Sequence, residues 1–247
     1  MASVHEFHSV EELEAEIEDS EKTFYFVRHG KTFANEFLDN FEWGDPTFEE
    51  PEMYDTNLSH KGVAHAISTH EELISDLDLR TELQDVELVV CSPLSRTLQT
   101  AQYLFYHKEH LLPPNVRRIV HPLVRERLFM TSDVGRLKHI LEEEYPGWDF
   151  SELPTDEWWF VHNEEIHEPY VEWRSGKYLC KGEASHIFAE RLKELRQWLV
   201  NRPEKKILVV GHWGVFMGLT GMDFKNCQLR KFKTSDLLEE PDTRCLG

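Results

Sequence analysis

The chain has 247 residues, of which 40% are hydrophobic and 12% are aromatic, and its formal net charge at pH 7 is −19. This length and composition are typical of one globular domain that can bury a sizeable core. The excess of acidic residues argues against nucleic acid and anionic membranes as partners, and no apolar run approaches the roughly 20 residues of a membrane-spanning helix.

The N-terminal residues and the cysteines bear on the compartment. Residues 1–22 are acidic and lack the basic and apolar regions of a signal peptide. The four cysteines are scattered and include no CxxC pair: Cys91, Cys180, Cys227 and Cys245. Their spacing predicts neither a disulfide framework nor a redox motif. We therefore expect a cytoplasmic protein.

Short apolar runs alternate with helical patterns along the chain. Residues 9–19 predict a short acidic helix capped at Ser9. Four apolar runs have the length and composition of buried strands: 23–28, 87–92, 117–121 and 205–212. Helices are expected in four further places: from Ser59 to about Asp76, after Pro93, from Val134 to Tyr145, and from Gly182 to Val200. This alternation predicts a three-layer α/β/α fold with a mostly parallel central sheet.

Two stretches without clear periodicity interrupt the alternation, at about 36–57 and 148–181. We expect them to be insertions in a single domain over residues 1–247, whose residues 1–21 form an acidic N-terminal extension. The second insertion is rich in tryptophan, at positions 148, 158, 159 and 173. In so acidic a protein, these rings are expected to pack the insertion rather than to stack on nucleic-acid bases.

Three of the expected strands end in polar residues: Arg28-His29-Gly30 after the first, Cys91-Ser92-Pro93 after the second, and Gly211-His212 after the fourth. The carboxyl ends of parallel strands meet at one edge of a sheet, where ligands of such folds bind. Arg96, one turn into the following helix, can reach the same place. Two histidines and two arginines beside helix N-termini form an anion site, and a small phosphorylated substrate is the partner that we expect.

The sequence resembles the histidine phosphatase superfamily, also called the phosphoglycerate mutase-like superfamily, in four motifs that occur in the family's order. They are the RHG signature at 28–30 with Thr32 and Asn35, CSPLSRTLQTA at 91–101, the glutamate of VRERLF at 124–129, and Gly211-His212. The segment TNLSHKG at 56–62 is similar to the family's PLSxxG segment. The resemblance spans roughly residues 22–220 and is closest to the plant and fungal phosphoglycerate mutase-like phosphatases.

The resemblance implies a site for phosphoryl transfer. His29 is implied to be the nucleophile that takes the phosphoryl group as a phosphohistidine. Arg28, Arg96 and His212 are implied to hold the phosphate oxygens, with Asn35 assisting. Nearby arginines keep a histidine neutral, and so nucleophilic, by lowering its pKa. Fixed guanidinium groups can stabilise the transferred group without a metal ion, so no cofactor is expected.

The resemblance also assigns a proton-transfer role to Glu126, which would protonate the leaving oxygen and then deprotonate the attacking water. Glu126 follows a short expected strand, HPLV, and lies between Arg125 and Arg127. A surface ion pair is therefore the alternative. In that case the proton donor is expected among the glutamates of the second insertion: Glu164, Glu165 and Glu168.

Two pairs of histidines outside these motifs raise the question of a metal site: His107 with His110, and His162 with His167. Their spacing does not match a tight set of metal ligands. We expect solvated surface there and no bound metal.

The expected function is a metal-independent phosphatase acting on small phosphomonoesters. A first alternative is a cofactor-dependent phosphoglycerate mutase. Members of the family with that activity carry a basic insertion after the catalytic glutamate, whereas this chain has only Arg136 and Lys138 early in that region and many acids later. A second alternative is a catalytically idle module that binds phosphate, which the complete set of motif residues argues against.

Overall fold

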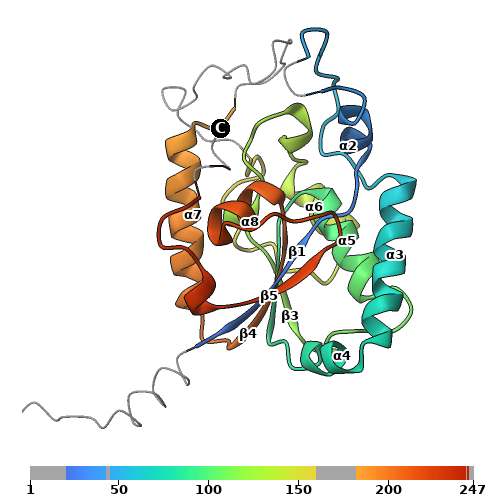
Figure 1. The fold of residues 1–247 in the computed structure, drawn as a ribbon, viewed down its shortest axis with the longest axis vertical. Helices are drawn as coiled ribbons and strands as arrows, with labels where there is room; N and C mark the ends of the chain where they lie inside the picture. The colour runs from blue at the N-terminus through green and yellow to red at the C-terminus, as the bar shows by residue number, and fades with distance from the viewer. Residues whose placement is uncertain (1–20, 43–44, 160–181, 243, 245–247) are drawn as a thin grey trace, which may run out of the picture.

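A five-stranded sheet forms the centre of the computed structural model, which describes residues 21–42, 45–159, 182–242 and 244 (Figure 1). The strands are β1 (Thr23–Arg28), β2 (Leu88–Cys91), β3 (Arg117–Val120), β4 (Lys206–Gly211) and β5 (Leu229–Lys233). Their order is β3-β2-β4-β1-β5. The strands β1 to β4 run parallel to one another, and β5 is antiparallel to β1. The predicted α/β fold with a mostly parallel sheet is confirmed.

Both faces of the sheet are buried, because successive side chains of a strand point to opposite faces. In β1, Tyr25 and Val27 pack on the face covered by α3, α4, α5 and α6. Phe24 and Phe26 pack on the other face, against α7 and α8. The helices are α3 (His60–Ser75), α4 (Leu77–Leu83), α5 (Ser95–Phe105), α6 (Lys138–Glu144), α7 (Ser185–Val200) and α8 (Trp213–Thr220). The result is the three-layer arrangement, with α7 and α3 on opposite sides of the sheet in Figure 1.

Two predicted helices have different bounds in the structure. The helix expected over 134–145 begins only at Lys138. The preceding carbonyl groups are engaged elsewhere, because the Val134 oxygen accepts the Asp55 N–H at 3.1 Å and the Arg136 oxygen accepts the Trp158 indole N–H at 2.9 Å. The helix expected from residue 182 begins at Ser185. By contrast, α3 starts where it is predicted, directly after Ser59, which caps the helix by accepting the Gly62 N–H.

One other local prediction is wrong, and two elements have different bounds in the structure. The expected strand HPLV is a 3₁₀ turn over Pro122–Val124, in which His121 Nδ1 accepts the Leu123 N–H at 3.3 Å. The helix after Pro93 begins at Ser95, where the Asp55 carboxylate accepts the Ser95 N–H at 2.8 Å. The first insertion was expected from residue 36, but α2 (Phe33–Leu38) extends into it. The predicted helix at 9–19 and residues 160–181 of the second insertion lie outside the described residues.

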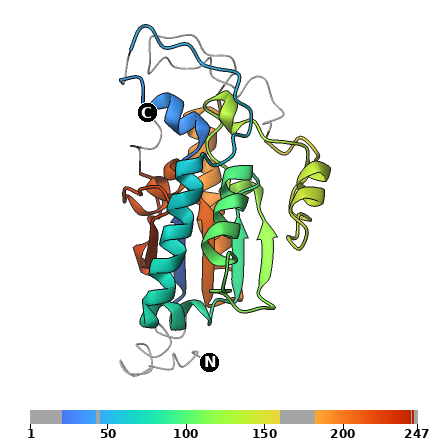
Figure 2. The ribbon, with the colours of Figure 1, turned by 90° about the vertical axis from the view of Figure 1, so that its right-hand side faces the viewer.

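The carboxyl ends of the parallel strands carry α2 and the remainder of the first insertion, residues 45–57, which lie above the strands in Figure 2. This segment is joined to the loop after β3 by hydrogen bonds. Thr131 Oγ1 donates to the Pro51 carbonyl at 2.9 Å, and the Thr131 N–H donates to the Glu50 carboxylate. Within the described residues, no helix is both long and apolar enough to span a bilayer.

Candidate active site

His29 follows β1 directly and is buried. Its backbone N–H donates to the Gly211 carbonyl at 3.0 Å, which continues the pairing of β1 with β4. The ring Nδ1 lies 2.7 Å from the Gly30 carbonyl oxygen. Since a carbonyl oxygen only accepts hydrogen bonds, Nδ1 carries the proton and Nε2 carries the lone pair. The imidazole is therefore oriented with Nε2 as its basic atom.

His212 caps α8 at the end of β4 and is fully buried. Its ring centroid lies 5.2 Å from that of His29, so the ends of β1 and β4 bring the two histidines together. The Nε2 atom is 2.7 Å from Ser92 Oγ, at the end of β2, and Nδ1 is 3.4 Å from an Arg96 nitrogen. Arg96 can only donate, so Nδ1 accepts and Nε2–H donates to Ser92.

Both rings stand in a positively charged, desolvated setting. Burial lowers the pKa of His29 well below its usual value, and the charges of Arg96 and Arg28 lower it further. Burial and Arg96 have the same effect on the pKa of His212. Both imidazoles are therefore neutral at neutral pH, which is the form in which a histidine can attack phosphorus.

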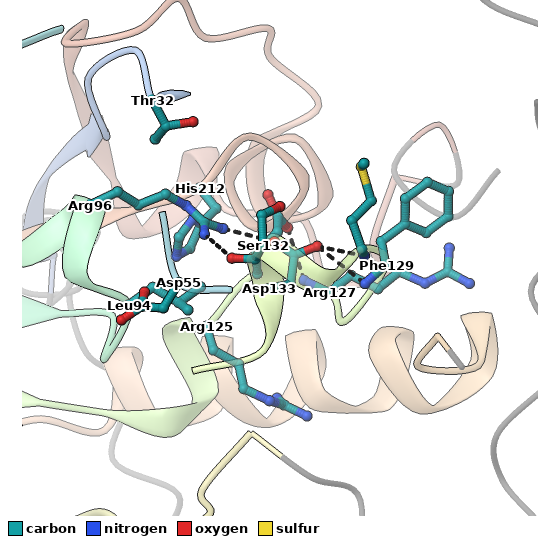
Figure 3. Close-up of polar contacts among 12 residues, drawn as sticks. Thr32, Asp55, Leu94, Arg96, Arg125, Arg127, Phe129, Ser132, Asp133 and His212 are labelled. Atoms are coloured by element: carbon teal, nitrogen blue, oxygen red, sulfur yellow. Dashed lines mark hydrogen bonds and ion pairs between the residues drawn. The ribbon is translucent and has the colours of Figure 1, made fainter. Parts of the chain in front are cut away.

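Arg96 lies in the first turn of α5 and is held from the opposite side by the loop after β3 (Figure 3). Its Nη1 donates to the Ser132 carbonyl at 2.7 Å, and its Nη2 donates to Asp133 Oδ1 at 2.8 Å. Asp133 Oδ2 in turn accepts the N–H groups of Phe129 at 3.2 Å and Met130 at 3.0 Å. Asp133 is not predictable from the sequence, because its only local signal is an acid that can accept N–H groups three and four residues earlier.

Arg28 ends β1 and is fixed from another side. Its Nη1 donates to the Phe224 carbonyl at 2.6 Å, while the buried Nε has no hydrogen-bond partner among the described residues. Burial lowers the pKa of this guanidinium, and the Glu126 charge acts in the opposite direction. A donor left unpaired in a buried site is available to an incoming oxygen anion.

The Glu126 carboxylate binds backbone N–H groups rather than the guanidinium groups of the flanking arginines. Its Oε1 accepts the Arg127 N–H at 2.9 Å, and its Oε2 accepts the Gly214 N–H at 3.3 Å. The flanking guanidinium groups are engaged elsewhere: Arg125 binds Glu183, and Arg127 binds the Glu183 carbonyl. Figure 3 shows both pointing away from Arg96 and His212. The alternative of a surface ion pair with these arginines does not fit this geometry.

The setting of Glu126 favours a carboxyl group that holds a proton. Burial raises its pKa above the ordinary value for glutamate, and the nearby Asp133 carboxylate raises it further. A proton donor for a leaving oxygen needs this property. The alternative donors, Glu164, Glu165 and Glu168, lie outside the described residues.

Asn35 caps α2 together with Thr32. Its N–H donates to Thr32 Oγ1 at 3.0 Å, and its Oδ1 accepts the Thr32 N–H at 3.2 Å. The cap places Asn35 in the turn directly after the RHG segment. Its contact with phosphate stays a prediction.

The residues considered for other roles have ordinary explanations where they are described. His107 and His110 are exposed, and the described part of the chain contains no group of three or more side chains that could hold a metal ion. Trp158 and Trp159 lie in the core under α6. His162, His167 and Trp173 lie outside the described residues.

Two neutral histidines and two fixed arginines thus lie together at the carboxyl ends of the parallel strands, the place where α/β proteins bind their ligands. The sequence model of the histidine phosphatase superfamily (branch 1) matches residues 24–237. The chain belongs to this superfamily.

Individual relatives were also found. The chain is 27% identical over 192 residues to a probable phosphatase of Schizosaccharomyces pombe, a match that covers 78% of this chain and 74% of that protein. Among solved structures, it is similar to the alpha-ribazole phosphatase of Shigella flexneri (20% identity, TM-score 0.48, covering 91% of this chain and 98% of that one). A mycobacterial glucosyl-3-phosphoglycerate phosphatase is also similar (18% identity, TM-score 0.45, covering 86% and 90%).

Proposed function

We propose that the chain is a metal-independent phosphatase that hydrolyses small phosphomonoesters through a phosphohistidine on His29. The observation that carries the proposal is the orientation of the His29 ring. Its Nδ1 donates to the Gly30 carbonyl, which leaves the Nε2 lone pair for attack, in a site lined by Arg96 and Arg28. The family match and the phosphatase relative support the general activity.

The first half of the reaction transfers the phosphoryl group to the protein. His29 Nε2 forms a bond to phosphorus while the bond from phosphorus to the ester oxygen breaks. Arg28 and Arg96 donate hydrogen bonds to the equatorial oxygens, whose charge they stabilise in a desolvated site. His212 joins them when its Nε2–H exchanges Ser92 Oγ for a phosphate oxygen. Glu126 gives its proton to the leaving oxygen, and an alcohol departs.

The second half returns the site to its starting state. Water attacks the phosphohistidine, and Glu126, now a carboxylate, takes its proton. The bond from phosphorus to His29 Nε2 breaks, and inorganic phosphate is released. Each group thus ends the cycle in the protonation state in which it began.

The contacts of Arg136 and Lys138 favour hydrolysis over a mutase reaction. Arg136 donates to the Asp55 carboxylate at 3.1 Å, to the Glu144 carboxylate at 2.5 Å and to the Ser95 hydroxyl at 2.5 Å. Lys138 donates to the Leu153 carbonyl at 3.3 Å. These cations are committed to the fold, so they do not offer the free positive charge that a carboxylated substrate needs.

The test is to trap the intermediate. Wild-type protein is mixed with a ³²P-labelled phosphomonoester and denatured in alkali, where phosphohistidine is stable. We expect label on the protein that is lost in acid, and none on His29→Ala. His121→Asn is the matched control, because His121 follows another parallel strand of the sheet, β3, and asparagine can keep its bond to the Leu123 N–H. Full turnover by His29→Ala, or labelling of that variant, contradicts the mechanism. Turnover or labelling of the protein in itself decides against the idle module.

A further inference from the structure

Arg191, on α7, binds the stretch of backbone that ends at Glu126. Its Nη1 donates to the carbonyl oxygens of Leu123 at 2.9 Å and Arg125 at 2.7 Å. Its Nη2 lies 3.4 Å from the Glu126 carbonyl oxygen. One buried side chain therefore satisfies three carbonyl groups in the turn between β3 and the proposed proton donor, which fixes the path of that turn.

Glu183 holds Arg191 in place. Its Oε1 accepts from Arg191 Nε at 2.9 Å and its Oε2 from Arg191 Nη2 at 2.6 Å, a two-point contact of the kind that fixes a guanidinium plane. Arg125 donates to the same Oε1 at 2.9 Å. Burial alone raises the pKa of the Glu183 carboxyl, but the two arginines hold it at about 2, so the group stays charged.

Gly214 fixes the other end of Glu126, its carboxylate. The Gly214 N–H donates to Oε2 at 3.3 Å, and a Cβ at this position would lie 2.6 Å from Oε1. That distance is too short for any side chain, so only glycine leaves the carboxylate where it is. Glycine inside a helix costs about 1 kcal/mol relative to alanine. The stability of α8 therefore does not account for the residue.

We propose that Arg191, held by Glu183, and Gly214 are positioning residues for Glu126: the first fixes its backbone and the second leaves room for its carboxylate. The proposal rests on the proposed function, in which Glu126 protonates the leaving oxygen. A proton donor must lie within hydrogen-bond reach of its target, and a small displacement costs rate in proportion to how much the reaction needs that proton.

The first test is Gly214→Ala, assayed with two substrates. Glycerol 2-phosphate has a poor leaving group that needs protonation, whereas 4-nitrophenyl phosphate has a good one. We expect kcat to fall by about 10–100-fold on the first and by less than about 3-fold on the second. Vanadate affinity, measured by calorimetry, stays at the wild-type value because the arginine clamp is untouched. In a Glu126→Gln background, Gly214→Ala has no further effect on kcat.

The second test is Arg191→Met, with Arg196→Met as its matched control. Arg196 lies on the same helix but donates to the Leu237 carbonyl, away from the site. We expect the selective loss on glycerol 2-phosphate for Arg191→Met, partial recovery for Arg191→Lys, and wild-type rates for Arg196→Met. Circular dichroism establishes whether each variant is folded. If Arg191→Met does not fold, Gly214→Ala alone tests the positioning of Glu126.

The outcomes separate this proposal from the proposed function. A selective loss for Glu126→Gln, combined with equal losses on both substrates for Gly214→Ala, overturns the positioning role alone. A full additional loss in the Glu126→Gln background overturns it as well. Equal losses on both substrates for Glu126→Gln itself remove the proposed role of Glu126, and this inference falls with it.

Discussion

Arg96 and Asp133 form a buried ion pair, with 2.8 Å between Nη2 and Oδ1, that joins α5 to the loop after β3. The arginine is thus held in one orientation before any phosphate binds. Fixed donors stabilise developing charge better than mobile ones, because no reorganisation is needed during the reaction. Burial is the larger cause of the raised pKa of Glu126. The same Asp133 carboxylate lies near Glu126 and raises this pKa further. Asp133 therefore acts on both the clamp and the proton donor.

We predict that Asp133→Ala lowers both activity and stability. The variant leaves the Arg96 charge unpaired and two backbone N–H groups without an acceptor. Breaking a buried pair costs about 3–5 kcal/mol of unfolding free energy, and we expect kcat/KM to fall by about 10–100-fold. Urea unfolding and steady-state kinetics measure the two effects. Asp133→Asn keeps one acceptor oxygen and should lose less stability and less activity. A wild-type kcat/KM in Asp133→Ala would show that the ion pair does not orient Arg96.

We predict a bell-shaped dependence of kcat/KM on pH. Burial and arginine charges lower the pKa of His29, so protonation stops the reaction only well below pH 6.5. Burial raises the pKa of Glu126, so it stays protonated above the usual value of 4.5, and the rate falls as pH rises through that pKa. Glu126→Gln should slow turnover of glycerol 2-phosphate by about 10²–10⁴-fold.

Glu126→Gln should also lose the fall in kcat/KM at higher pH that deprotonation of Glu126 causes. The titration of the substrate phosphate is common to both proteins, so their comparison isolates the glutamate. An unchanged alkaline limb in Glu126→Gln would mean that another group supplies the proton.

We predict that chelators leave the rate unchanged, within about 2-fold. The charge of the transferred phosphoryl group is balanced by Arg28 and Arg96, which need no metal ion. The measurement is hydrolysis of 4-nitrophenyl phosphate after prolonged incubation with EDTA, with an untreated sample as the control. A rate that collapses in EDTA and returns with magnesium would refute the proposed role of the arginines.

The central strands and the site were predictable because each rests on a local pattern with a clear spatial consequence. A buried parallel strand is a short apolar run, and its polar end must lie at the ligand edge of the sheet. That reasoning brought His29 and His212 together. The edge strand β5 gave no such signal, because LRKFK is mostly charged and has only Phe232 buried.

Residues whose partners lie far away in the sequence were not predictable. Asp133 and Glu183 read as ordinary surface acids, because nothing near them in sequence shows that each meets an arginine in the core. The sequence predicts a strand at the turn Pro122–Val124, because its apolar residues are equally consistent with both structures. Tertiary contacts, rather than local preference, decide such positions.

We predict that Glu183→Gln destabilises the protein in a manner that depends on pH. The pKa of this carboxyl is about 2 in the folded protein, below the ordinary 4.5. A group whose pKa is lowered by folding stabilises the fold above its unfolded pKa, and this contribution disappears as pH falls through the folded pKa. The free energy of unfolding at pH 7 should therefore fall by about 3–5 kcal/mol in the variant, which leaves Arg125 and Arg191 without their shared anion.

The difference between wild type and Glu183→Gln should be constant above pH 4.5 and shrink steadily toward pH 2. Urea unfolding at a series of pH values measures it, with Glu190→Gln as the control. Glu190 is an exposed glutamate on α7, the helix that follows Glu183, and lies 3.5 Å from Lys193; its loss should change stability by less than about 0.5 kcal/mol. A difference for Glu183→Gln that does not vary between pH 7 and pH 2 would mean that packing, and not the charge held between the two arginines, is what Glu183 contributes.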